Sequence, residues 1–226
     1  RALNMGLDKD IIADKVMGQG QRPAWLISQP DIGGVTLKQP DYASWPRDKR
    51  IAEAKKLLNE AGFNESHPLV FNLLYNTSET HQRIAIAASS MWKKNLGVEA
   101  KLQNQEWKTM LDTMHTHNFD AVRYAWIADY DDAASFLNNF RTGDSENTSQ
   151  YSNPAYDKAL HDAAKAADTT ARGKFYQQAE DLLAEDVPAI PVYHYVRTHL
   201  VKPWVGGFEP DKLGYYYTKD MYIKKH

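Results

Sequence analysis

Between residues 68 and 127, short apolar stretches alternate with longer segments that have helical periodicity. The predicted strands lie at 68–75, 98–102 and 119–127, and the predicted helices lie at 79–95 and 107–115. The order strand, helix, strand, helix, strand is typical of β-α-β units, because parallel neighbouring strands need a crossover connection. We therefore predict an α/β fold with a central, mostly parallel sheet flanked by helices.

Further helices are predicted on both sides of this alternation. Apolar residues at helical spacing predict a helix over 48–61, and another over 169–184. The chain begins in helical segments, for which Asp8 is an expected N-cap. Residues 18–47 are rich in glycine and proline, which predicts a long connection that is functional or packs against another body. Two prolines within 187–195 exclude an ordinary central strand there.

Charge and composition exclude several classes of function. Twenty-seven Lys and Arg residues face 29 Asp and Glu residues, and no large block has one sign, so we expect no nucleic-acid partner. No apolar run approaches the ~18 residues of a membrane span, so we expect no membrane insertion. The chain has no cysteine, which removes disulfides, thiolate nucleophiles and zinc-thiolate sites. A G-x-S-x-G elbow and an H-E-x-x-H helix are also absent.

Charged and aromatic residues are densest from 123 to 132, where the third predicted strand runs off its carboxyl end. Open α/β sheets bind ligands at that edge. Arg123 lies among apolar neighbours and needs a partner, and Asp129 follows six residues later. Asp129 could pair with Arg123 internally, lie in solvent as an ordinary loop acid, or hold a ligand cation, and the spacing alone leaves all three interpretations open.

Two other kinds of site could use the acids near residue 129, a metal site and a hydrolase active site. A metal site could combine His115 and His117 with the acids near 129, but about 30 Å of extended chain separates the two groups, so no metal or other cofactor is expected. A hydrolase using the carboxylates of Asp129 and Asp131 also remains open, because the spacing of such pairs is spatial.

Three more residues lie near the same predicted edge. His81 lies in the first turn of the 79–95 helix, where the helix dipole disfavours a cation and favours an anionic partner. The alternative is that His81 is a surface histidine with no role. Trp107 and Trp126 either flank a common space at this edge or pack in the core.

Long stretches of the sequence resemble the periplasmic oligopeptide-binding proteins of ABC importers. The resemblance is carried by EAKKLLNEAGF (53–63), by the run from FNLLYNTSETHQ to TMLDT (71–113), by WIADYDDAASFLN (126–138) and by VPAIPVYHYVRTHLVKPWVGG (187–207). It implies a periplasmic receptor of two lobes that close on a short peptide, without catalysis, and deliver it to a membrane permease. Residues 1–196 would form the C-terminal ligand-binding lobe, and residues 197–226 would return to an N-terminal lobe.

The resemblance also implies roles for individual residues. Asp129 would hold the α-ammonium group of the peptide through a charge-assisted hydrogen bond. Main-chain groups around Ala125 and Ile127 would pair with the ligand as a strand does. The remaining implied contacts are pocket walls from Trp107 and Trp126, carboxylate contacts from Arg123 and His81, and cleft lining from His115 and Tyr195.

The sequence departs from the oligopeptide-binding pattern at two positions. Met17 and Met114 stand where such relatives carry basic residues. The loss of two cations should weaken generic recognition of peptide C-termini. It is compatible with the branch of the family that binds cell-wall murein tripeptide, which is the finer functional expectation.

Overall fold

Three parallel strands form the sheet around which the rest of the chain is arranged. The computed structural model describes residues 1–211 and 213–225. Strand β2 (Val70–Asn76) lies in the centre, between β3 (Glu99–Gln105) and β4 (Ala121–Val122). Helices α4 (Glu79–Leu96) and α5 (Trp107–His115) make the two connections. The predicted α/β order and the parallel pairing are therefore confirmed.

The two sides of β2 differ in how far they are paired. Seven residue pairs join β2 to β3, from Val70↔Glu99 to Asn76↔Gln105, whereas only two pairs join β2 to β4. The predicted strand over 119–127 is therefore wrong in extent. Beyond β2, the amide of Thr77 donates to the carbonyl of Gln105 at 2.8 Å, so the chain continues beside β3. No described residue pairs its main chain with residues 124–127.

Helix α4 covers one face of the sheet. Ser78 is its N-cap and accepts the amide of His81, and Gly97, with φ of 73°, ends the helix in the left-handed region that favours glycine. The core beneath it is apolar. It includes the buried residues Leu7, Ile12, Leu58, Leu73, Tyr75, Ala85, Ala88, Trp92, Val98 and Ala100. Alternate residues of β2 therefore contribute to this core, as the period of a strand requires.

Helix α5 covers the opposite face. The side chain of Glu106 caps it by accepting the amide of Lys108 at 2.8 Å. A small core of Leu74, Met110 and Met114 lies between this helix and the sheet. The last four residues of the central strand, 73–76, are thus buried on both faces, which is the usual environment of a parallel sheet.

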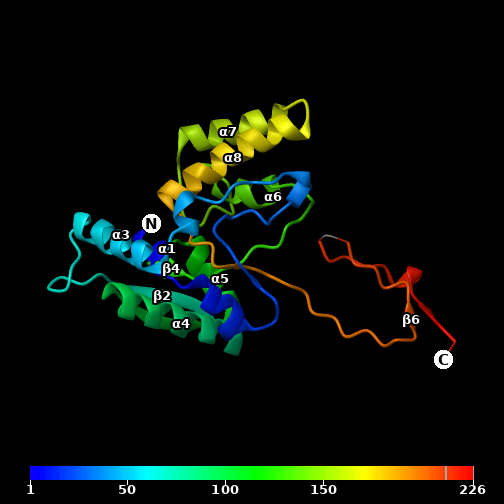
Figure 1. The fold of residues 1–226 in the computed structure, drawn as a ribbon, viewed down its shortest axis with the longest axis horizontal. Coiled ribbons are helices and arrows are strands. Elements are labelled where there is room, and N and C mark those ends of the chain that lie inside the picture. Colours follow the sequence, from blue (N-terminus) through cyan, green and yellow to red (C-terminus); the bar gives the residue numbers. More distant parts are fainter. Residues whose placement is uncertain (212, 226) are drawn as a thin grey trace.

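A helical hairpin forms a second body beside the sheet, made of α7 (Pro154–Lys165) and α8 (Thr169–Asp186), as Figure 1 shows. The predicted helix over 169–184 corresponds to α8, whereas α7 was not predicted. The side chain of Asn153 caps α7, and Pro154 occupies its first turn. The hairpin packs on the short helices α6 (Ala134–Leu137) and η4 (Asn138–Phe140) around a core that contains Tyr156, Leu160, Tyr176 and Leu183.

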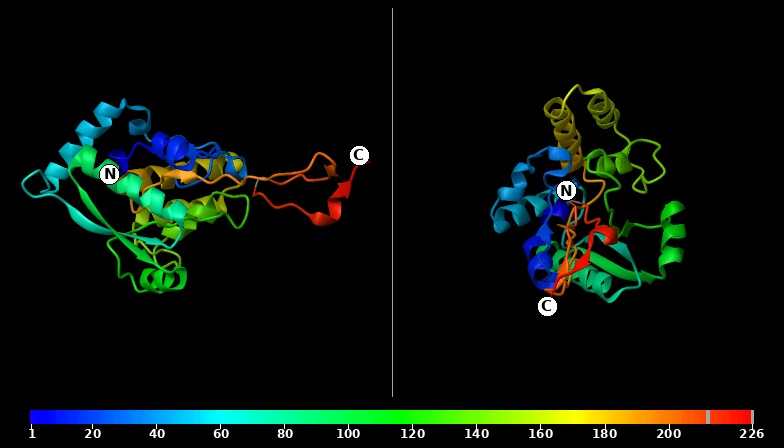
Figure 2. Two further views of the ribbon diagram at one scale, coloured as in Figure 1. Left: turned by 90° about the horizontal axis from the view of Figure 1, so that it is seen from below. Right: turned by 90° about the vertical axis from the view of Figure 1, so that its right-hand side faces the viewer.

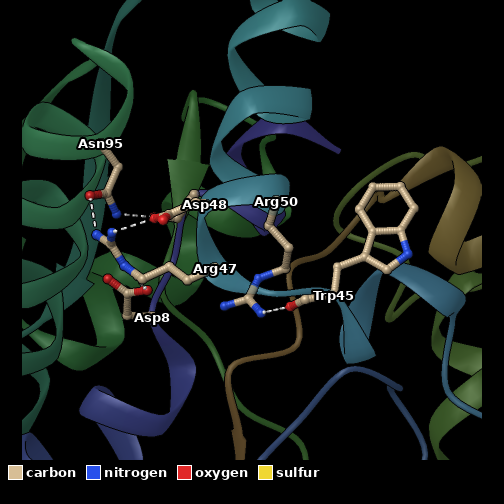
Figure 3. A network of polar contacts seen from close by, with 7 residues as sticks. Asp8, Trp45, Arg47, Asp48, Arg50 and Asn95 are labelled. Atoms are coloured by element: carbon tan, nitrogen blue, oxygen red, sulfur yellow. Dashed lines mark hydrogen bonds and ion pairs between the residues drawn. The ribbon is translucent and has the colours of Figure 1, made fainter.

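The first residues are held by a polar network rather than by the predicted cap. The chain opens with α1 (Ala2–Met5), α2 (Lys9–Ile11) and the π-helix η1 (Ile12–Met17). Asp8 makes no side-chain cap; its carboxylate instead accepts from Arg47 Nε at 2.9 Å. Arg47 begins α3 (Arg47–Glu60) and also donates to Asn95 Oδ1 at 2.7 Å, so one guanidinium joins the opening segment to α3 and α4 (Figure 3).

The glycine- and proline-rich connection over 18–47 packs against α8, as one of the two predicted alternatives had it. It contains β1 (Arg22–Pro23) and two short 3-10 turns, η2 (Ile32–Gly34) and η3 (Asp41–Ser44). The buried carboxylate of Glu180 in α8 accepts the amides of Ile27 at 3.1 Å and Ser28 at 2.7 Å. Strand β1 also pairs antiparallel with β5 (Tyr193–His194), which is as short as the neighbouring prolines predict.

Residues 197–225 extend away from the body, as Figure 2 shows, with residue 212 outside the described part. They contain β6 (Val205–Gly206), η5 (Thr218–Asp220) and β7 (Tyr222–Ile223), and among the described strands β6 pairs with β7 alone. Large apolar side chains are exposed here, including Leu200, Trp204, Tyr215, Tyr217, Tyr222 and Ile223. No helix in the described part of the chain is long and apolar enough to span a membrane.

Candidate functional site

The chain that follows β4 presents unpaired main-chain groups. The amide of Arg123 still donates to the carbonyl of Leu74 at 2.7 Å. No described residue makes a hydrogen bond with the peptide groups of residues 124–127, which we call the free edge. An unpaired sheet edge is a template for another extended chain, because its N–H and C=O groups are already aligned.

Asp129 lies two residues beyond the free edge. Its side chain is exposed, and no described residue forms a hydrogen bond or ion pair with its carboxylate. Its amide donates to Ser135 Oγ at 2.7 Å, so the main chain is fixed while the charge is left unneutralised. The alternative in which Asp129 pairs internally with Arg123 is therefore wrong for this structure.

Arg123, Tyr195 and His81 lie close together near the start of the free edge. The guanidinium of Arg123 donates to the hydroxyl of Tyr195 and lies 5.9 Å from the centre of its ring. His81 Nδ1 is 2.7 Å from the side-chain oxygen of Asn76, which ends β2. Burial, followed by the nearby charge of Arg123, lowers the pKa of His81 to about 4, so this histidine is neutral at pH 7. The cluster presents a cation and a polar ring without a carboxylate partner in the described part of the chain.

Aromatic and aliphatic side chains surround the free edge. Trp107, the first residue of α5, is 45% exposed and stacks on Tyr124, with ring centres 6.2 Å apart and an interplanar angle of 10°. Ile127 is 61% exposed, and Tyr130 is also exposed. Tyr124 and Tyr130 were not predicted as site residues, although their alternation with Arg123 and Asp129 in the sequence was a usable signal.

Trp126 behaves differently from Trp107. Its ring is partly buried and packs against the core of the helical hairpin, which is what the packing alternative expected. Its indole Nε1 is buried and has no hydrogen-bond partner among the described residues. No contact between the two indoles is seen in the described part, so the structure does not bring them around one common space.

Two other sequence expectations concern residues outside this group. His115 is exposed at the last position of α5, about 12 Å along the helix from Trp107, and it contacts neither Arg123 nor His81. Met114 is buried with Leu74, so it belongs to the core.

The acids after Asp129 are occupied by structural contacts. Asp131 Oδ1 accepts the amide of Gly33 at 2.8 Å, and Asp132 accepts from Arg172 at 3.0 Å and from Tyr176 at 2.5 Å. A hydrolase of this kind needs a second carboxylate beside Asp129, and both neighbouring carboxylates already accept hydrogen bonds within the protein. Within residues 1–211 and 213–225, no three His, Asp or Glu side chains gather as a metal site would require.

Comparison with known proteins gives consistent matches. Residues 1–148 match "Bacterial extracellular solute-binding proteins, family 5 Middle". The chain is 50% identical over 226 residues to the periplasmic oligopeptide-binding protein OppA of Salmonella typhimurium, which covers all of this chain and 42% of that protein. It is 43% identical over 228 residues to the periplasmic murein peptide-binding protein MppA of Escherichia coli, with the same coverage.

The fold agrees with these matches. The structure of Haemophilus influenzae OppA in complex with RPPGFSPFR superposes with a TM-score of 0.90 at 43% identity, over 99% of this chain and 44% of that one. The chain thus spans less than half the length of the relatives it matches. With more than half of its residues matched by the family, the chain belongs to family 5 of the bacterial extracellular solute-binding proteins.

Proposed function

We propose that this chain is part of a periplasmic receptor that captures short peptides and delivers them, without catalysis, to the membrane permease of an ABC importer. The observation that carries the proposal is the unneutralised carboxylate of Asp129 beside a free edge of main chain. Peptides have a matching pair of features, an ammonium group and an extended backbone. The similarity to OppA and MppA, both named as periplasmic peptide-binding proteins, supports the ligand class and the compartment.

Each part of the site then has a role. Asp129 holds the α-ammonium group, and the free edge pairs with the ligand backbone. Arg123, assisted by His81, meets a carboxylate further along the ligand, because Arg123 has no acidic partner in the described chain. The residues proposed to contact ligand are Asp129, Arg123, Trp126, Ile127, Trp107, His81, His115 and Tyr195.

The chain supplies one side of the cleft. Residues 1–196 form the C-terminal ligand-binding lobe, and residues 197–226 return to a second lobe that covers their exposed aromatic side chains. Leu200 is 97% exposed, as expected of a side chain whose apolar partners lie in another part of the protein. Closure of the two lobes would exclude water from Asp129 and strengthen its interaction with a cation.

The finer proposal is that the ligand is cell-wall murein tripeptide. It is supported by Met17, where the resemblance gives oligopeptide-binding relatives a basic residue. The second such position, Met114, lies in the core and gives no support. The identity of 50% to OppA against 43% to MppA favours general oligopeptides instead. Mass spectrometry of small molecules that co-purify with the two-lobed receptor decides between the two: a diaminopimelate-containing tripeptide supports the finer proposal, and a mixture of ordinary peptides contradicts it.

The main test is titration calorimetry on the two-lobed receptor with a tripeptide and its N-acetylated form. Asp129→Ala should weaken binding of the free tripeptide by about 2–5 kcal/mol, because a buried ammonium loses its partner. Acetylation of the ligand should cause a similar loss in the unmodified receptor. Glu65→Ala, which removes an exposed acid from a distant turn, is the matched control. Equal affinity for both ligands would reject the role of Asp129, and steady hydrolysis of the peptide would favour the enzyme alternative.

A further inference from the structure

Two side chains on α8 form hydrogen bonds with the loop that carries Asp129. Asp132 Oδ2 accepts from Arg172 Nη1 at 3.0 Å, and Oδ1 accepts from the hydroxyl of Tyr176 at 2.5 Å. Oδ1 also accepts the amide of Ala134 at 2.9 Å, so one carboxylate links the helix to the main chain of this loop. Tyr176 is only 4% exposed, which holds its hydroxyl in one direction.

The same loop, residues 129–135, is fixed at two further points. Asp131 Oδ1 accepts the amide of Gly33, and the amide of Asp129 donates to Ser135 Oγ. Gly33 has φ of 61°, and a Cβ there would lie 3.1 Å from Asp132 Cα and 3.2 Å from the carbonyl oxygen of Asp131. The two main chains therefore meet closely at this point, where the positive φ also favours glycine, and this contact holds the loop against the connection over 18–47.

The three acids of this loop, Asp129, Asp131 and Asp132, differ in how far partners within the protein engage their carboxylates. Arg172 neutralises Asp132, and one oxygen of Asp131 accepts the amide of Gly33, so both neighbours make contacts inside the protein. Of these three acids, Asp129 is the one whose carboxylate forms no hydrogen bond or ion pair with a described residue. If Asp132 were released, a second mobile acid would lie three residues away, and the main chain beneath Asp129 would gain freedom that ligand binding must then remove.

We propose that Arg172 and Tyr176, acting through Asp132, are positioning residues that set the affinity of Asp129 for the amino group of the ligand. This inference rests on the proposed function, because it assigns the ligand ammonium to Asp129. Its physical basis is preorganisation: a fixed carboxylate loses less entropy on binding than a mobile one. Neither α8 residue needs to touch the ligand for this effect.

The test measures discrimination rather than affinity alone. In the two-lobed receptor, Tyr176→Phe removes one hydroxyl and keeps the ring in the core. We expect the ratio of affinities for a free and an N-acetylated tripeptide to fall by about tenfold, equivalent to 1.4 kcal/mol. Tyr151→Phe is the matched control, because Tyr151 also donates to a carboxylate, that of Asp186 at 2.6 Å, at the far end of α8. Its ratio should not change.

A second variant and a double variant complete the design. Arg172→Gln should lower the ratio in the same direction, and it provides a result if Tyr176→Phe fails to fold. In an Asp129→Ala background, Tyr176→Phe should cause no further loss of discrimination, because the positioned group is already gone.

The outcomes separate this inference from the proposed function. If the unmodified receptor binds neither tripeptide, the proposed function fails. If it binds both tripeptides equally, the role of Asp129 fails, and the inference fails with it. If the unmodified receptor discriminates but Tyr176→Phe and Arg172→Gln keep its ratio, or weaken both ligands equally, only the positioning role is overturned.

Discussion

The two neighbours of the central strand β2 differ in how far they pair with it. On one side, β3 pairs along its whole length and exposes a charged outer edge that includes Glu99 and Lys101. On the other side, β4 stops after two residues and continues as the apolar free edge. Charged side chains protect an edge from unwanted pairing, whereas an apolar edge with unpaired main chain invites it. The difference teaches that a strand-like segment with no partner strand in its own chain can be a binding site for an extended chain of another molecule.

The largest effect expected from this contrast is on stability. Leu74 is 1% exposed on β2, and Leu74→Ala should lower the free energy of unfolding by about 2–5 kcal/mol, because it opens a cavity beside Met110. Ile127→Ala, on the free edge, should change it by less than about 0.5 kcal/mol. Urea denaturation measures both. Similar losses for the two variants would show that the free edge is packed in solution.

Proline substitutions test the hydrogen bonding of the two sides directly. The amide of Glu99 donates toward β2, and that of Lys101 shares this direction two residues later, so Lys101→Pro should cost about 3 kcal/mol of stability. Ala125→Pro lies where no described hydrogen bond is lost and should cost less than about 1 kcal/mol. It should nevertheless weaken peptide binding in the two-lobed receptor. Normal peptide affinity would exclude backbone pairing at Ala125.

The pH dependence of stability should reveal the neutral histidine beside Arg123. The folded-state pKa of His81, about 4, lies below the ordinary 6.5, so the unfolded chain binds the proton more tightly. Stability is therefore retained above pH 6.5 and is lost as the pH falls toward 4, by about 1 kcal/mol once solvent screening is allowed for. His81→Gln should flatten this part of the curve. The exposed His161→Gln is the control and should leave the slope intact.

The smallest expected effect concerns the stack between α5 and the free edge. Trp107 and Tyr124 are both exposed, so their coupling in a double-mutant cycle should lie at the low end for aromatic pairs, about 0.5 kcal/mol. Thermal unfolding of Trp107→Ala, Tyr124→Ala and the double variant gives this energy. Additive losses would show that the rings do not support the free edge.

Local signals in the sequence predicted most of the sheet and its helices. The helix over 79–95 could be found because its N-cap and its terminal glycine are adjacent in sequence to the periodic residues. The predicted strand over 119–127 is too long because an apolar pattern shows only that the side chains suit a strand. Whether those residues pair depends on the neighbouring strand, and β2 ends before it could pair with residues 124–127. The signals for α7, Asn153 and Pro154, were present and were not used.

Local signals in the sequence also predicted part of the site. Arg123 and Asp129 lie in one short segment, so their density in the sequence pointed to the edge. The pairing of Arg123 with Tyr195, however, joins residues 72 positions apart, and that of Asp132 with Arg172 joins residues 40 apart. No local pattern contains such contacts. The internal pairing of Arg123 with Asp129 remained an open alternative until the three-dimensional arrangement showed Asp129 unneutralised.

The buried carboxylate of Glu180 has a consequence for the order of folding. It satisfies the amides of Ile27 and Ser28, which lie about 150 positions earlier in the chain. Before α8 packs against it, the connection over 18–47 lacks this acceptor. Its two amides therefore remain hydrated until α8 docks, so their protection from hydrogen exchange measures the docking of that helix.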